Sequence, residues 1–289
     1  MSAQLNKDAG LKPAPYTDHF VEVAGLRLRY QDYGTAGKPP MLCVHGSAAH
    51  AHWFDFVAAG FTGDHHVLAI DQRGHGDSQW DNTPAPDYSA DRYAADLNEA
   101  AEKLDLRDFV LVGHSMGGLV STVYASTYPG RAKAFVLIDS SISMSHDRIA
   151  SMREAGNREG RSYATQKEFA SQFRLRPTGG TAAPEVLRHL AQHSGRQFSD
   201  GRWRYKFDRN VYAKREHMGG YPYWSNIKIP ALLVKGDRSA RITPEIIAEV
   251  QSRAPQVKVA EVARSDHHIT LDNPQGFVQV VNEFLNKIK

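Results

Sequence analysis

The sequence predicts an α/β protein in which a mostly parallel sheet is flanked by helices and a helical segment is inserted after the sixth strand. Short apolar or alternating runs recur along the chain, and from residue 41 onward they alternate with helical patterns. Such alternation predicts parallel strands joined by right-handed crossovers. The alternation stops after residue 138 and returns at residue 229, which marks the inserted segment.

The strands are predicted from short runs that are rich in apolar and β-branched residues. They cover residues 20–23, 26–30, 41–44, 66–70, 109–112, 134–138, 231–234 and 257–262. Helices are predicted where apolar residues recur at helical spacing. These segments are residues 93–104, 116–128 and 274–288, and within the insertion residues 148–154, 167–173 and 184–192.

The domain organisation follows from this pattern. We predict a core of residues 18–140 and 225–289, an insertion of residues 141–224 and an N-terminal tail of residues 1–17. The insertion is basic, with 15 Lys or Arg against 8 Asp or Glu between residues 141 and 221. The whole chain has 35 basic and 32 acidic side chains, so no overall field favours a nucleic acid or a membrane as partner.

The cysteine, the N-terminal residues and the histidines predict the protein's location and its need for disulfides, metals or cofactors. Cys43 is the single cysteine and lies in the apolar run M-L-C-V, so no intrachain disulfide can form and a buried thiol is expected. Residues 1–17 lack the apolar core of a signal peptide, which predicts a cytoplasmic location. None of the 14 histidines forms an H-E-x-x-H or Cys-rich spacing, and we expect neither a metal nor an organic cofactor.

The most specific motif is F-V-L-V-G-H-S-M-G-G-L-V, in which a predicted strand runs through Gly113-His114-Ser115-Met116-Gly117 into a predicted helix. This is the G-x-S-x-G nucleophile elbow in its strand-turn-helix context. Glycines are needed because side chains at 113 and 117 would collide with the neighbouring strand and helix. The turn would hold the Ser115 Oγ at the carboxyl edge of the sheet, near a helix amino terminus that favours negative charge.

A second motif, M-L-C-V-H-G-S-A-A-H, follows the third predicted strand. A serine hydrolase needs two backbone N–H groups aimed at the oxygen of the tetrahedral intermediate. The N–H of Met116, directly after the nucleophile, can supply one of them. The N–H of Ser47, which follows His45-Gly46, is the candidate for the other.

With these motifs the chain resembles the α/β-hydrolase superfamily, and within it the bacterial branch of carboxylesterases, lactonases and carbon-carbon bond hydrolases. The resemblance extends from about residue 20 to residue 285. The stretch D-Q-R-G-H-G-D-S at residues 71–78 is similar to the family's loop after the fourth strand, where we expect Asp71 and Arg73 to pair within the loop. The insertion stands where family members carry a lid.

The resemblance implies that the base is a histidine late in the chain, after the nucleophile and the acid. Two adjacent histidines occur in A-R-S-D-H-H-I-T-L-D-N-P, after the last predicted strand. Family members commonly place this histidine seven residues before the proline that opens the final helix, here Pro274, which selects His267. His268 stays the alternative and is otherwise expected to face the lid. His114 is expected to pack or hydrogen-bond beside the nucleophile.

The acid is the least certain member of the site. Most relatives carry it three residues after the glycine that ends the seventh strand, but that position here is Ser239. A minority carry it directly after the sixth strand, where this chain has Asp139 in A-F-V-L-I-D-S. We therefore predict Asp139 as the acid. Asp237, one residue after Gly236, remains the alternative.

The resemblance implies a serine hydrolase that cleaves carboxylic esters of small or aromatic compounds through an acyl-enzyme. Alternatives with the same catalytic residues are an amide, lactone or carbon-carbon bond hydrolase of aromatic-ring catabolism. An acid that follows the sixth strand favours the amide hydrolase among them. A different class is a small-molecule receptor on the same fold, and a homodimer is left open. The substrate contacts that we expect are His45, Gly46, His114 and His268, with Trp203 and Tyr205 from the aromatic and basic stretch D-G-R-W-R-Y-K-F-D. The alternative for that stretch is an amphipathic hairpin with a solvated basic face.

Overall fold

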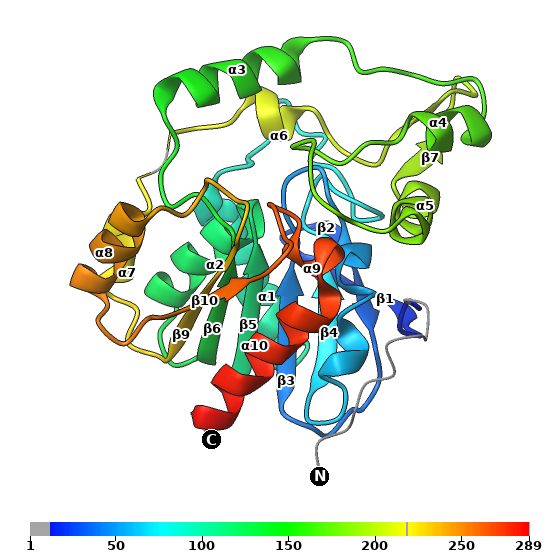
Figure 1. The fold of residues 1–289 in the computed structure, drawn as a ribbon. Coiled ribbons are helices and arrows are strands. Elements are labelled where there is room, and N and C mark those ends of the chain that lie inside the picture. The colour runs from blue at the N-terminus through cyan, green and yellow to red at the C-terminus, as the bar shows by residue number, and fades with distance from the viewer. Residues whose placement is uncertain (1–11, 218, 289) are drawn as a thin grey trace.

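The computed structural model describes residues 12–217 and 219–288 and contains one large sheet with helices on both faces (Figure 1). The strand order across this sheet is β1-β2-β4-β3-β5-β6-β9-β10. The bounds are β1 Thr17–Val23, β2 Leu26–Asp32, β3 Pro40–Val44, β4 His66–Ile70, β5 Phe109–His114, β6 Ala132–Ile138, β9 Ala231–Gly236 and β10 Lys258–Val262. The pairs β1–β2 and β2–β4 are antiparallel and the remaining pairs are parallel, so the predicted mostly parallel sheet is confirmed.

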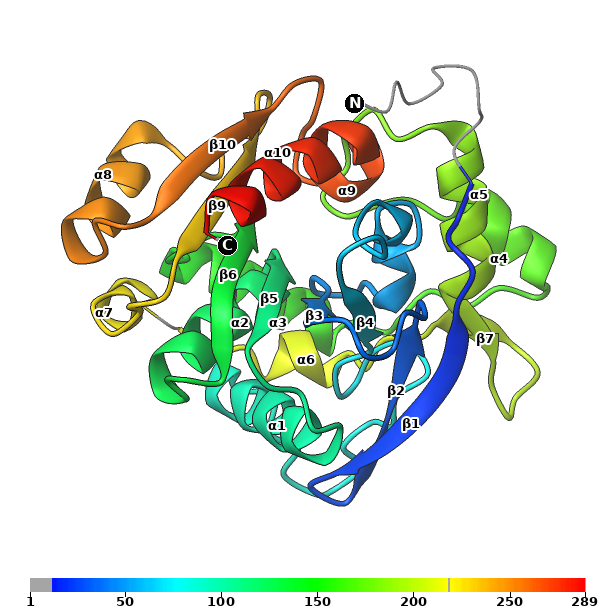
Figure 2. The ribbon, with the colours of Figure 1, turned by 90° about the horizontal axis from the view of Figure 1, so that it is seen from below.

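Two hydrophobic clusters hold the helices against the sheet, one on each face. In β3 the side chains of Met41 and Cys43 belong to one cluster, and those of Leu42 and Val44 belong to the other. This is the alternation expected of a strand that is buried on both faces. In Figure 2, α10 (Pro274–Lys287) lies on one face of the sheet, and α1 (Ala90–Lys103) and α2 (Met116–Thr127) lie on the other. Buried residues of α10 belong to the first cluster, and those of α1 and α2 belong to the second.

Smaller helices complete the core of the molecule. They are η1 Ala51–Phe54, η2 Ala58–Gly60, α8 Pro244–Arg253 and α9 Ile269–Asp272. The last helix of the insertion, α7 Tyr221–Trp224, packs against α8 and α2. Among the residues that the structure describes, no helix is long and apolar enough to cross a membrane. The predicted N-terminal tail falls mostly outside the described residues, and its last residue, Thr17, already belongs to β1.

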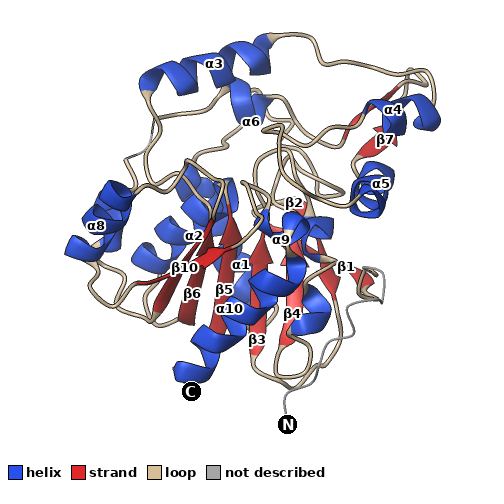
Figure 3. Cartoon of the chain, viewed as in Figure 1, coloured by secondary structure: helices blue, strands red, loops and turns tan. Residues whose placement is uncertain are grey.

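Between β6 and β9 the chain leaves the sheet and runs over the edge where β5 and β6 end (Figure 3). We call residues 141–224 the inserted segment. It contains α3 His146–Asn157, α4 Gln166–Gln172, α5 Pro184–His193 and α6 Asn210–Ala213. It also contains an antiparallel hairpin of β7 (Gly195–Gln197) and β8 (Trp203–Tyr205), which the expected helical pattern did not include.

The loop after β4 is held by buried ion pairs, but not by the expected one. Asp71 accepts hydrogen bonds from Arg29 at 3.1 Å and from the Ala51 N–H at 2.7 Å. Arg73 instead donates to Asp96 at 2.8 Å. The prediction that Asp71 and Arg73 pair within the loop is therefore wrong, because each side chain ties the loop to a different neighbouring segment.

Candidate active site

Ser115 sits at the sharp turn between β5 and α2, with backbone angles φ 53° and ψ −118°. A non-glycine residue in this region carries strain of about 1–3 kcal/mol, which the packing around the turn must hold. The glycines on either side make that packing possible. A Cβ at Gly117 would lie 2.3 Å from the carbonyl oxygen of Val44, and one at Gly113 would lie 2.6 Å from the carbonyl oxygen of Gly117. The turn is therefore pressed directly against β3.

Ser115, His267 and Asp139 form a chain of hydrogen bonds. The Nε2 of His267 is 3.0 Å from the Ser115 Oγ, and the Nδ1 of His267 is 2.7 Å from Oδ2 of Asp139. The three residues come from the ends of β5, β6 and the loop after β10, and β5 and β6 are neighbours in the sheet. A proton on Nδ1 leaves Nε2 free to accept the serine proton, which is the arrangement that a general base needs.

Asp139 has a second partner in Ser239, which donates a hydrogen bond of 2.8 Å to the same Oδ2. Ser239 stands where most relatives would carry the acid, so the side chain at that position still contacts the carboxylate. Asp237 lies elsewhere. It is exposed, and its Oδ1 accepts a hydrogen bond from the Ser265 N–H at 2.9 Å, which ties the loop after β9 to the loop after β10.

The electrostatics of the site favour a neutral histidine beside an ionised acid at neutral pH. Burial lowers the pKa of His267, and the positive charges of Arg241 and Arg148 lower it further. Burial raises the pKa of Asp139 to about 6, against the hydrogen bond from Ser239 and the charge of Arg241. A pKa of about 6 leaves this carboxyl mostly ionised at pH 7.

Ser47 and Met116 line the same cavity as Ser115. Neither backbone N–H donates a hydrogen bond to another described residue. The turn after β3 lies close to the nucleophile, since a Cβ at Gly46 would be 3.0 Å from the Cβ of Ser115. Two free donors beside a nucleophile can hold the oxygen of a tetrahedral intermediate.

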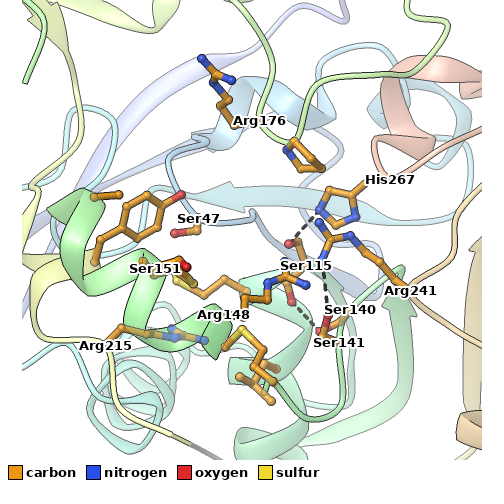
Figure 4. A pocket seen from close by; sticks show the side chains of 17 residues that line it. Ser47, Ser115, Ser140, Ser141, Arg148, Ser151, Arg176, Arg215, Arg241 and His267 are labelled. Carbon is orange, nitrogen blue, oxygen red and sulfur yellow. Dashed lines mark hydrogen bonds between the residues drawn. The ribbon is translucent and has the colours of Figure 1, made fainter. Parts of the chain in front are cut away.

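Two cavities open on Ser115 and His267, and both residues line both of them. The smaller cavity has a volume of about 290 Å³ and is bordered by arginines and by Met144, Met152 and Leu119. Its polar side chains are drawn in Figure 4. The larger one has a volume of about 550 Å³, and its wall combines aromatic rings with five arginines: Trp53, Tyr163, Phe173, Phe198, Tyr205, Phe207 and Tyr212, and Arg161, Arg174, Arg176, Arg204 and Arg209. Both cavities beside the nucleophile are therefore lined by arginines, and the larger one also has many aromatic rings.

The other residues that we predicted as substrate contacts divide into two groups. Gly46, His114, Tyr205 and His268 line the larger cavity. The Nε2–H of His114 donates to the carbonyl oxygen of His267 at 2.9 Å, and that of His268 donates to the carbonyl oxygen of Pro177, in the inserted segment, at 3.2 Å.

The second group does not reach the substrate space. His45 is fully buried, and its ring bonds the backbone of Gly46 at 2.7 Å and of Gln72 at 3.0 Å. Trp203 borders neither cavity, and its backbone bridges to that of Tyr163. Sequence reasoning placed Trp203 at the site because aromatics alternate with basic residues there. Trp203 and Tyr205 are two residues apart in β8 and share a face, but only Tyr205 reaches the larger cavity.

Among the described residues one group could hold a metal ion, namely His52, His189 and His193. None of the three lines either cavity. Two of them are already occupied, because the Nδ1 of His52 and the Nε2 of His189 bond Asp55 at 2.8 and 2.6 Å. These hydrogen bonds connect η1 and Asp55 with α5.

The fold and the serine-centred site define an α/β hydrolase, and comparison with known proteins agrees. The model of the α/β-hydrolase fold family matches residues 39–274, and the chain belongs to this family. An esterase of Mycobacterium tuberculosis is 26% identical over 98% of this chain and 94% of its own length. The 2-(acetamidomethylene)succinate hydrolase of Mesorhizobium japonicum is 24% identical over 93% of this chain and 97% of its own length.

A solved structure of an E-2-(acetamidomethylene)succinate hydrolase superposes with a TM-score of 0.82. It is 22% identical and covers 94% of this chain and all of its own, so it supports the fold alone. Family membership together with hydrolase relatives of full length supports a hydrolase.

Proposed function

We propose that this protein is a serine hydrolase that cleaves carboxylic esters through a covalent acyl-enzyme. The observation that carries the proposal is the hydrogen-bonded chain from the Ser115 Oγ through His267 to Asp139, with separations of 3.0 and 2.7 Å. The esterase relative adds support at the level of reaction type. In this proposal the inserted segment acts as a lid over the two cavities.

The reaction follows from the geometry. The Ser115 Oγ attacks the ester carbonyl carbon while its proton passes to the Nε2 of His267. The N–H groups of Ser47 and Met116 hold the oxyanion, and the imidazolium returns the proton to the leaving alcohol. Water then attacks the acyl-enzyme with His267 as base and releases the carboxylic acid. Asp139 keeps the proton of the neutral histidine on Nδ1 and stabilises the imidazolium.

An amide hydrolase is the second candidate, since one full-length relative is named for cleaving an acetamido compound and the acid here follows the sixth strand. The same residues would act, with the imidazolium protonating an amine or enamine nitrogen. Comparing kcat/KM on an ester and on the matching amide separates the two functions. A kcat/KM on the amide equal to or above that on the ester would make the amide hydrolase the first candidate.

The test of the mechanism uses a fluorophosphonate, which phosphonylates activated serines. We expect one adduct on Ser115 by mass spectrometry and none in Ser115→Ala. Rapid-quench assays with 4-nitrophenyl acetate should then give a burst of one equivalent of nitrophenol. Binding of the ester without a burst or turnover would favour the receptor alternative.

A further inference from the structure

The smaller cavity contains a buried arginine that has no carboxylate partner among the described residues. Arg215 is only 6% exposed, and its Nε is buried without a hydrogen-bond partner in the described part of the chain. Burial and the nearby cation of Arg148 lower the pKa of Arg215, and the other groups that act on it are the phenols of Tyr93 and Tyr212 rather than a carboxylate.

Further cationic groups face the same space. Arg148 from α3 and Arg241 from the loop after β9 line the cavity together with Arg215 and Ser115 (Figure 4). None of the described residues that line it is an Asp or a Glu. Arg241 is 3.7 Å from the triad acid Asp139, which is itself shared with a histidine and a serine. The cavity is therefore positively charged and lacks a counter-ion of its own.

Two of the arginines that line the larger cavity bond to the protein instead. Arg204 pairs with Asp200, and Arg174 donates to the carbonyl oxygens of Ser171 and Phe173 at 3.0 and 2.6 Å. Leaving a guanidinium buried and unpaired is costly, because water no longer solvates the charge. The cost is recovered when a ligand supplies the anion, and a carboxylate fits the planar fork of a guanidinium group with two parallel hydrogen bonds.

We infer that Arg215, assisted by Arg148, binds a free carboxylate of the substrate in the smaller cavity beside Ser115. The inference rests on the proposed function and specifies its substrate class as esters, or amides, that carry a second, unesterified carboxyl group. The volume of about 290 Å³ suits a short carboxylate-bearing arm, and the larger cavity of about 550 Å³, which has aromatic rings as well as arginines in its wall, takes the rest of the substrate. The basic excess of the inserted segment would also attract such anions.

The experiment compares anionic esters with neutral counterparts. Monomethyl succinate against dimethyl succinate places the free carboxylate on the acyl side, and 4-acetoxybenzoate against phenyl acetate places it on the leaving group. Rates are followed by pH-stat, with Ser115→Ala as the blank. We expect at least one anionic ester to have the higher kcat/KM, by about 10- to 100-fold, as for hydrogen bonds to charged groups.

Arg215→Gln should abolish this preference, whereas Arg158→Gln should keep it. Arg158 is a matched control because it lies at the end of α3, is largely exposed and pairs with Glu154 outside both cavities. Arg148→Gln is the second variant if Arg215→Gln does not fold, and it should reduce the preference in the same direction.

Binding gives a readout that does not require turnover. We expect succinate or benzoate to bind Ser115→Ala in calorimetry, and the Arg215→Gln change to weaken that binding about 10-fold or more. Turnover of neutral esters without preference for either anion, or a preference that survives Arg215→Gln and Arg148→Gln, would overturn the subsite and leave the hydrolase intact. Anion binding to Arg215 in a protein that cleaves none of the four esters would support the subsite and count against the proposed ester hydrolysis.

Discussion

Replacing Asp139 by Asn tests which carboxylate orients the histidine. The Oδ2 of Asp139 accepts from His267 at 2.7 Å and from Ser239 at 2.8 Å. Asn has nearly the same shape, but it has one acceptor oxygen instead of two and no charge to stabilise the imidazolium. Loss of a triad acid can lower kcat by about 10⁴. We expect kcat on 4-nitrophenyl acetate to fall by about 10³ to 10⁴ in Asp139→Asn.

Asp237→Asn is the control for this measurement. Asp237 is exposed and its carboxylate bonds only backbone N–H groups in its turn, so the change should leave kcat within about twofold of the parent. A collapse in Asp237→Asn together with near-normal turnover in Asp139→Asn would refute the assignment. It would also mean that the turn after β9 rearranges when substrate binds.

A double variant tests whether a carboxylate at position 239 can replace that of Asp139. Because the Ser239 Oγ is 2.8 Å from Oδ2 of Asp139, a carboxylate at position 239 lies within reach of the same histidine. Adding Ser239→Asp to Asp139→Asn should therefore raise kcat at least about tenfold above the single variant. Ser239→Ala in the same background is the matched control and should give no recovery. Equal rates for both double variants would show that position 239 no longer reaches His267.

Three further predictions follow from contacts of the site and core. Gly117→Ala should lower the free energy of unfolding by at least about 2 kcal/mol in urea, because its Cβ would lie 2.3 Å from a β3 carbonyl oxygen; unchanged stability would contradict this packing. Arg241→Gln removes a positive charge that lowers the pKa of His267, so the acid limb of the pH profile of kcat/KM should move to higher pH. A move to lower pH would contradict this effect of Arg241 on the pKa of His267. Arg73→Gln leaves the buried Asp96 without its main partner and should lower the free energy of unfolding by about 3–5 kcal/mol in the same urea assay. A decrease below about 1 kcal/mol would contradict the importance of this ion pair.

The parts of the fold that sequence predicts well are those with a strong local pattern. All eight predicted strands are present in the sheet, because buried parallel strands are continuous apolar runs that turns interrupt clearly. The sequence offers an amphipathic hairpin at residues 200–208 only as an alternative, because strands of three residues are too short for an alternating pattern to stand out; β8 lies in that stretch and pairs with β7. The pairing of Asp71 was mistaken because its partner, Arg29, is 42 residues away in the sequence.

At the site, predictability depended on whether a role is tied to a local motif. The elbow fixes Ser115 within five residues, and the structure places His267 and Asp139 beside it. The substrate contacts were harder, because the inserted segment contains 15 Lys or Arg between residues 141 and 221 and no local pattern tells which face inward. The lack of an acidic partner for Arg215 emerges only once the neighbours of its side chain are known.

The basic cavity links the charge of the substrate to the chemistry. Arg241 and Arg148 favour neutral His267 in the free protein, which suits a base, but they oppose the imidazolium that forms as Ser115 attacks. A substrate carboxylate in this cavity would offset those charges when the imidazolium forms, whereas a neutral ester would leave them uncompensated. The preference for anionic esters should therefore appear in kcat as well as in KM. The pKa of His267 should also be higher in the substrate complex than in the free protein. The pH dependence of kcat reports the pKa in the complex, and the pH dependence of kcat/KM reports the pKa in the free protein.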